Sequence, residues 1–313
     1  MKDTERYTHL NEYLKNKFGE RVLKICIDGG FTCPNRDGSM GTGGCIFCGE
    51  RGSGEHIKTD KNLAILESIR NQVTAYFSSY KASRANKFIV YFQNFSNTYA
   101  DIETLKERYN AALIDNRIVG ISIATRPDCI TEDIAKLLKL YTNKYYVSVE
   151  LGLQTANETT GKLINRGYTN ADFSNAVSLL RKYDIEVVAH MMVGLPGESL
   201  EDLIDTVNFL NSHDINGLKI HSTYVIKNTQ LAEMYLSGKY EPITLEYYIE
   251  AVIFILEHIK KNIVIHRISG DAPKNLLLVP EWNLHKKWII NGITKALREK
   301  NTWQGKSSKK LEE

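Results

Sequence analysis

Short apolar segments alternate with amphipathic helical segments along most of this chain, and that alternation limits the fold more strongly than any other feature. Segments rich in β-branched and aromatic residues predict strands at 22–28, 87–92, 118–124, 145–151, 185–193, 217–222 and 262–266. Helical periodicity predicts helices at 5–19, 61–80, 101–113, 131–141, 170–183, 199–211, 244–261 and 285–299. The alternation favours a parallel sheet that closes, wholly or in part, into a barrel.

No Pro-, Gly- or Ser-rich linker divides the 313 residues, so we expect a single α/β domain. The expected architecture is a partial (β/α)6 barrel, similar to a TIM barrel, over residues 21–275. An N-terminal helix over 1–20 precedes it, and a C-terminal helical extension follows over 276–313. The extension ends in a basic tail with Lys309 and Lys310, which we expect to be solvated.

Composition excludes several classes of protein. Hydrophobic residues make up 42% and charged residues 25% of the chain, which is typical of globular proteins. No apolar run approaches the ~18 residues of a membrane span, and the charged N-terminus is unlike a secretory signal. A net charge of +3 neither requires nor excludes a nucleic-acid partner. We therefore expect no membrane partner, and the cysteines, which do not form a disulfide framework, favour the reducing cytoplasm.

Three of the five cysteines, Cys33, Cys45 and Cys48, lie in one glycine-containing loop directly after the first predicted strand. The other two, Cys26 and Cys129, are isolated, so the set does not form a disulfide framework. Clustered thiolates are soft ligands that favour an iron–sulfur cluster or zinc. Three protein ligands are one fewer than a closed structural site uses and are typical of a site with an open position.

A closed zinc site is the alternative at this point, with Cys33, Cys45, Cys48 and His56 as a Cys₃His set. No second Cys-x2-Cys pair accompanies it, and the place of the loop at a barrel mouth favours the cluster. Neither isolated cysteine is expected to be a ligand, and we expect Cys26 to be a small core residue.

Polar residues follow the predicted strands at their C-terminal ends, which is where barrels of this kind carry their reacting groups. The set comprises Gln93, Asn94, Arg126, Glu150, Gln154, His221 and Ser222.

Together these features resemble the radical S-adenosylmethionine (SAM) superfamily, in the branch of the Elongator catalytic subunit and its stand-alone bacterial relatives. The resemblance covers residues 20–275 and includes Phe47 just before the last loop cysteine. The matching strand-end motifs are Ala-Thr-Arg-Pro-Asp at 124–128, Val-Glu-Leu-Gly-Leu-Gln-Thr at 149–155, Asn-Arg-Gly at 165–167, Met-Val-Gly-Leu-Pro-Gly-Glu at 192–198 and His-Arg-Ile-Ser-Gly-Asp at 266–271. The gap between Cys33 and Cys45 is longer than the superfamily's usual three residues, as it is in this branch.

The resemblance implies a [4Fe–4S] cluster held by the three loop cysteines, with one iron left to bind SAM. A reductant such as flavodoxin or ferredoxin would supply the electron that cleaves SAM to methionine and a 5′-deoxyadenosyl radical. It further implies SAM contacts from strand-end residues: Phe47 at the adenine, Gln93 and Asn94 at the methionine ammonium, Glu150 at the ribose or the ammonium, Gln154 and Arg166 at ribose and carboxylate, and His221 and Ser222 at the adenine side. We expect the segment 34–44 to cover the cluster or to shape the substrate entrance.

The stand-alone relatives imply a tRNA substrate whose wobble uridine carries a 5-carboxymethylaminomethyl group, with or without a 2-thio group. The reaction would leave 5-aminomethyluridine, through hydrogen abstraction from the methylene, oxidation to an imine and hydrolysis that releases glyoxylate. A carboxylate in the substrate calls for an arginine, and Arg126 and Arg267 are the candidates. Structural pairing of these arginines with Asp128 and Asp271 is the alternative.

Two other functions remain open from the sequence. One is a radical SAM oxidoreductase that acts on a small metabolite or a tetrapyrrole, because many chemistries share one barrel rim. The other is a non-enzymatic RNA-binding module with structural zinc.

Overall fold

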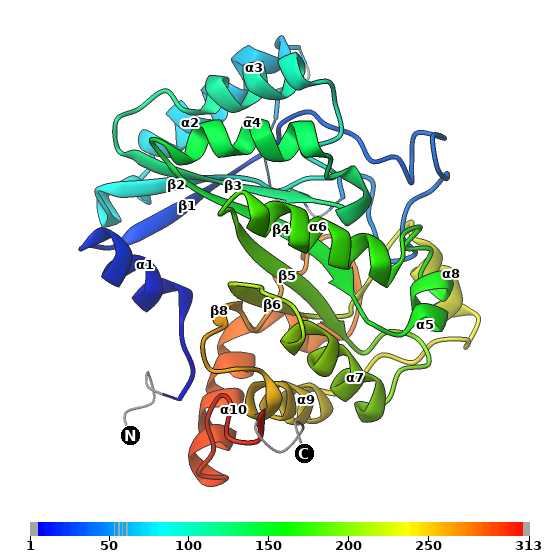
Figure 1. Cartoon of the computed structure of the whole chain (residues 1–313). Coiled ribbons are helices and arrows are strands. Elements are labelled where there is room, and N and C mark those ends of the chain that lie inside the picture. The colour runs from blue at the N-terminus through cyan, green and yellow to red at the C-terminus, as the bar shows by residue number, and fades with distance from the viewer. Residues whose placement is uncertain (1–5, 53, 56, 58, 61, 309–313) are drawn as a thin grey trace.

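A curved sheet of seven parallel strands forms the centre of the protein, in a computed structural model that describes residues 6–52, 54, 55, 57, 59, 60 and 62–308. The strands pair in chain order (Figure 1). They are β1 (Val22–Ile27), β2 (Lys87–Phe92), β3 (Ile118–Thr125), β4 (Tyr146–Gln154), β5 (Glu186–Val193), β6 (Gly217–Ser222) and β8 (Val264–Arg267). The sheet runs from β1 at one edge to β8 at the other, so it is a half-barrel, and the predicted partial α/β barrel is confirmed.

Helices cover the outer face of the half-barrel, as Figure 1 shows for the layer from α2 to α9. Their bounds are α1 (Leu10–Phe18), α2 (Ile65–Phe77), α3 (Ile102–Ala112), α4 (Glu132–Thr142), α5 (Glu158–Leu163), α6 (Asn170–Lys182), α7 (Leu200–Asn211), α8 (Gln230–Leu236), α9 (Leu245–His258) and α10 (Lys286–Glu299). Several begin at the side-chain caps that sequence favours, for example Thr169 and Ser199, whose capping boxes start α6 and α7.

The two faces of the sheet differ in chemistry, and this difference positions the site. On β4, Val147, Val149 and Leu151 point outward and pack in the main core under the helices. The alternating residues Ser148 and Glu150 point to the inner face, which the helices leave uncovered. A polar inner face on an open half-barrel is suited to enclose a ligand rather than a packed core.

Four short elements were not predicted from the sequence: α5, α8 and the antiparallel pair β7 (Val225–Ile226) and β9 (Leu277–Val279). Each is shorter than the window over which periodicity is informative. Short 3₁₀ turns also occur at Ala82–Arg84, Pro127–Cys129 and Glu281–Leu284.

The first residues of the predicted helices 5–19 and 61–80 lie outside the described residues, as do Lys309 and Lys310 of the basic tail. Within the described part of the chain, no helix has the length and apolar character needed to cross a membrane.

Candidate cofactor and substrate cavity

A cavity opens at the C-terminal ends of the strands, with an empty volume of about 1480 Å³ that includes its mouth. The cysteine loop after β1 forms one wall, with Cys33, Cys45 and Cys48 in the lining. Glu150 and Lys219 line the inner face of the sheet below it. The topology therefore brings together residues that are more than 100 positions apart in sequence, as the parallel arrangement predicts.

All three loop cysteines are free thiols. Burial raises the pKa of Cys45 to about 11 and raises that of Cys48 further, and the neighbouring Cys33 adds to both shifts. Bringing these thiols together without a metal therefore disfavours their ionised form. A bound cation reverses this balance, because a coordinating thiol is deprotonated. The donor set thus fits a thiolate-ligated metal group.

Reciprocal hydrogen bonds hold the loop against the chain that follows α5. Asn35 Nδ2 donates to the carbonyl of Asn165 at 2.6 Å, and Asn165 Nδ2 donates to the carbonyl of Gly44 at 2.8 Å. Gly44 has a φ of +79°, which favours glycine. Within the segment 34–44, Arg36 and Gly44 line the cavity. The segment therefore fixes the position of Cys45 and contributes to the cavity wall.

The described thiols do not by themselves define a site for a single metal ion. Among the described residues, no three His, Cys, Asp or Glu side chains converge on one point that an ion could occupy. A four-iron cluster instead receives its thiolates at separate corners. His56, the fourth ligand of the alternative zinc site, lies outside the described residues.

Glu150 is the centre of an ionic network on the floor of the cavity. Its Oε1 accepts a hydrogen bond from Lys24 Nζ at 2.8 Å, and its Oε2 contacts Lys219 Nζ and, at 2.9 Å, His190 Nε2. The side chain is 1% exposed. Burial alone would raise the pKa of Glu150, but Lys219, Lys24 and His190 hold it well below its usual value. Glu150 is therefore ionised, and both its oxygens are engaged by protein groups.

Most of the predicted site residues lie in the cavity lining. They are Cys33, Phe47, Cys45, Cys48, Gln93, Arg126, Glu150, Gln154, His221, Ser222 and Arg267. Two others, Asn94 and Arg166, are not part of the lining.

Asn94 lies behind the cavity wall. Its side chain is fully buried, and Nδ2 donates to Asp28 Oδ2 at 2.8 Å. The backbone of Gly54 covers it so closely that a Cβ added there would meet Asn94 Oδ1 at 1.7 Å. The neighbouring Gln93 faces the cavity instead. Both residues follow the end of β2, where the chain bends at Asn94, and only Gln93 reaches the site.

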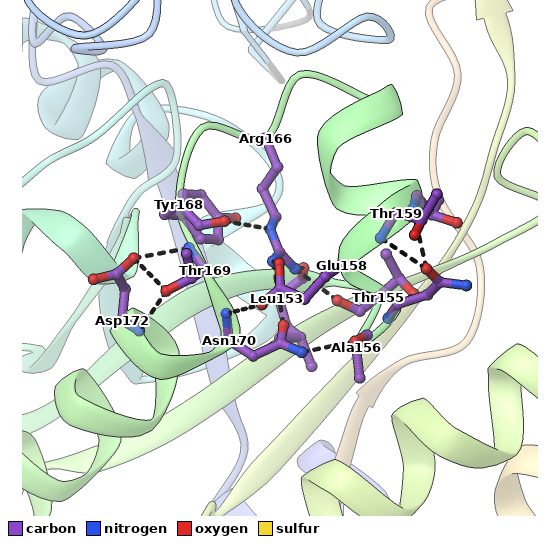
Figure 2. A network of polar contacts seen from close by, with 12 residues as sticks. Leu153, Thr155, Ala156, Glu158, Thr159, Arg166, Tyr168, Thr169, Asn170 and Asp172 are labelled. Carbon is purple, nitrogen blue, oxygen red and sulfur yellow. Dashed lines mark hydrogen bonds and ion pairs between the residues drawn. The ribbon is translucent and has the colours of Figure 1, made fainter.

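Arg166 is fully buried and its five donors are engaged within the protein (Figure 2). Nε donates to the carbonyl of Tyr168, and Nη1 donates to those of Leu153 and Thr155 at 2.9 and 2.6 Å. Nη2 completes the set with Glu158 Oε2 at 3.0 Å and the side chain of Asn170. This guanidinium joins the end of β4 to α5 and α6. All five donors are used within the protein, and the expected contact with ribose or carboxylate stays a prediction.

The two substrate-binding candidates differ in how strongly they are held. Arg126 is 7% exposed and donates to both oxygens of Asp128, and its Nη1 donates to the carbonyl of Arg166 at 3.0 Å. Arg267 has one looser ion pair, 3.4 Å from Asp271, and its side chain is 33% exposed. The alternative of structural pairing therefore applies chiefly to Arg126, while Arg267 is the more available cation.

Three residues of the ionic network around Glu150 were missed in the sequence: His190 and Lys219, which line the cavity, and Lys24, which does not. The signal was a charged or polar residue inside an otherwise apolar strand, which is costly unless it is paired or functional. The expectation for Cys26 is wrong. Its side chain is exposed, because β1 is an edge strand whose inner face opens to solvent.

A parallel half-barrel with a three-thiol cavity at the carboxyl ends of its strands defines a class of α/β proteins that hold a cofactor at that end. Comparison with known families agrees with this class. Residues 35–210 match the radical SAM superfamily, and residues 215–299 match the radical SAM C-terminal domain. The chain belongs to the radical SAM superfamily, as its motifs predicted, and the family implies a [4Fe–4S] cluster and SAM.

The relatives lie in the Elongator-like branch. The YtqA protein of Bacillus subtilis is 38% identical over 311 residues, which cover 99% of this chain and 95% of YtqA. The tRNA uridine(34) acetyltransferase of Methanocaldococcus infernus is 30% identical over 171 residues, 52% of this chain and 30% of that enzyme. The solved structure of M. infernus Elp3 without residues 1–46 shares the fold, with a TM-score of 0.66, 21% identity, and coverage of 90% of this chain and 64% of that one.

Glu198, at the end of the 192–198 motif, predicts a measurable dependence of stability on pH. Burial raises its pKa to about 7, against the smaller opposing effect of hydrogen bonds with the side chains of Thr155 and Thr160. Between pH 4.5 and 7 the folded protein thus holds a proton that the unfolded chain has released, so stability falls as the pH rises through this window. We expect the free energy of unfolding of Glu198→Gln, measured relative to that of wild type, to be higher at pH 8 than at pH 4.5. The expected difference between the two pH values is on the order of 2 kcal/mol.

Urea unfolding at several pH values measures this difference, with the exposed Glu201→Gln on the same helix as the control. Parallel stability curves for wild type and Glu198→Gln would show that the carboxyl is not held protonated in the folded state.

Proposed function

We propose that this protein is a tRNA-modifying radical SAM enzyme that converts 5-carboxymethylaminomethyl-(2-thio)uridine at the wobble position to 5-aminomethyl-(2-thio)uridine. The observation that carries the proposal is that three free thiols and the available cation Arg267 line the same cavity. A cofactor held by the thiols and a substrate carboxylate held by the cation would then meet inside it. A relative whose name specifies tRNA uridine 34 supports RNA as the substrate.

Cys33, Cys45 and Cys48 would hold the [4Fe–4S] cluster, which, when bound, supplies the reductive cleavage of SAM to methionine and a 5′-deoxyadenosyl radical that removes a hydrogen atom from the substrate. The electron would come from a reductant such as flavodoxin or ferredoxin. Thiolate ligands and a tRNA substrate are consistent with a cytoplasmic protein.

Residues around the thiols would bind and orient SAM. Phe47 packs against a small apolar cluster and also lines the cavity, where it would contact the adenine. Gln93, just after β2, and Gln154, at the end of β4, both line the cavity and would provide amide groups for the amino acid and ribose. Ser222 also lines it, but its hydroxyl already donates to Asn283 Oδ1, so it presents an acceptor.

The test is conversion of a defined tRNA. Protein reconstituted anaerobically with iron and sulfide is mixed with dithionite, SAM and tRNA that carries the carboxymethylaminomethyl group. We expect 5′-deoxyadenosine, glyoxylate and the 5-aminomethyl nucleoside, each identified by mass spectrometry. The same tRNA without the 5-substituent serves as the control substrate. Cleavage of SAM with no change in the nucleosides, both here and in tRNA from a strain lacking the gene, would refute the proposed substrate.

A further inference from the structure

The floor of the cavity carries more positive than negative side chains. Lys24 and Lys219 both pair with the carboxylate of Glu150, and the charge of Arg267 acts on Lys219. Lys219 and Arg267 are register partners on β6 and β8, so two cationic residues are neighbours at this edge of the half-barrel. Arg267 also pairs with Asp271 at 3.4 Å, so three cationic side chains face two carboxylates, and the floor has a net positive charge when Lys219 is protonated.

Titratable groups on the floor respond to this charge. Burial, together with the neighbouring cations, lowers the pKa of Lys219 to about 7, even though Glu150 opposes the shift. Burial also lowers the pKa values of His190 and His221, and Lys219 and Arg267 lower both further. These side chains come from β5, β6 and β8, so the field is a property of the whole floor. An anion is the ligand that such a field stabilises.

Donors that reach the cavity are present on the same surface. Lys219 and Arg267 both belong to the lining, whereas Lys24 does not. The Lys219 ammonium has three N–H donors, and its contacts among the described residues are Glu150 Oε2 and, at 3.2 Å, the hydroxyl of Tyr91. His221 lines the cavity too, and its Nε2 is buried without a hydrogen-bond partner in the described structure. In the tautomer that carries its proton on Nε2, this unpartnered nitrogen can donate to a ligand group with acceptor oxygens.

We propose that Lys219, Arg267 and His221 form an anion subsite that binds the carboxylate of the substrate's 5-carboxymethylaminomethyl group. The inference deepens the proposed function and rests on it for the identity of the substrate. Glu150 is a positioning residue here, because its contacts hold Lys219 at the cavity wall. Substrates that lack the carboxylate leave the positive floor uncompensated, so the subsite discriminates in favour of the carboxymethylated nucleoside.

The test compares two anticodon stem-loops that differ only in this carboxylate. One carries 5-carboxymethylaminomethyluridine at the wobble position and the other carries 5-methylaminomethyluridine. We expect wild-type protein to bind the first at least about tenfold more tightly. Lys219→Gln and, separately, Arg267→Gln are expected to lose most of this ratio, and Lys219→Arg is expected to retain it. Lys295→Gln, an exposed lysine on α10, is the matched control. Far-UV circular dichroism verifies that each variant is folded.

A second arm tests the subsite without RNA. N-methylglycine, but not methylamine, is expected to raise the unfolding temperature of wild-type protein, and Lys219→Gln is expected to lose this shift. If the stem-loops do not bind while N-methylglycine is recognised, the proposed tRNA substrate fails and the subsite stands. Equal binding of the two stem-loops with no response to N-methylglycine overturns the subsite. An unchanged ratio with a tenfold loss of SAM affinity in Lys219→Gln also overturns it, because the cations would then serve the cosubstrate.

Discussion

Cys45→Ala is expected to abolish assembly of the iron–sulfur cluster and to reduce the formation of 5′-deoxyadenosine from SAM by at least about 1000-fold. Cys45 lies in the cavity wall with Cys33 and Cys48, and no disulfide ties up any of the three thiols. Three thiolates are the minimum for a four-iron cluster that leaves one iron open, so two would not retain it. Iron and sulfide content, absorbance near 400 nm and the yield of 5′-deoxyadenosine report the loss.

Cys26→Ala provides the matched control for this prediction. Cys26 is also a free cysteine, but it is exposed on β1 and is not part of the cavity lining. We expect the control to bind iron and cleave SAM as wild type does. Equal loss in both variants would show that the assignment of the ligands to the loop is wrong, and full activity of Cys45→Ala would do the same.

The strands and the helices that cover the outer face of the sheet could be predicted from sequence, because they depend on interactions between residues that are close in the chain. Parallel strands that are buried by helices have nearly continuous apolar sequences, as β2 (Lys87–Phe92) has. The helices between these strands begin at residues that are recognisable as caps. The order of the strands then follows from the connections, because consecutive parallel strands are usually adjacent. The same reasoning placed the cysteine loop at the carboxyl end of β1, beside the polar residues that end the other strands.

The contacts on the inner face of the sheet are harder to predict, because the side chains that pair there are distant in sequence. Glu150 was expected to contact SAM from its place on β4, but its carboxylate is held by Lys24 and Lys219, which are 126 and 69 residues away. No spacing rule connects these three residues; only the curvature of the sheet brings them together. A polar residue in a strand indicates function or pairing, and sequence alone does not distinguish the two.

Arg166 could likewise have had a functional or a structural role, and its structural role predicts a large effect on stability. We expect Arg166→Ala to lower the free energy of unfolding by about 3 to 5 kcal/mol, as removal of one partner from a buried charged network does. The side chain is fully buried, and its loss leaves the carbonyls of Leu153, Thr155 and Tyr168 without their donor. Urea unfolding followed by circular dichroism measures the change.

Arg181→Ala is the control that separates burial from charge. Arg181 also pairs with a carboxylate, Asp214, at 2.8 Å, but on the surface, where an ion pair contributes about 0 to 1 kcal/mol. A ligand-binding role for Arg166 predicts the opposite pattern, with normal stability and a raised KM for SAM. Because the guanidinium uses its donors on the backbone around β4, loss of stability is expected to precede any loss of affinity. A stable Arg166→Ala protein with weakened SAM binding would restore the role that its Asn-Arg-Gly motif implied.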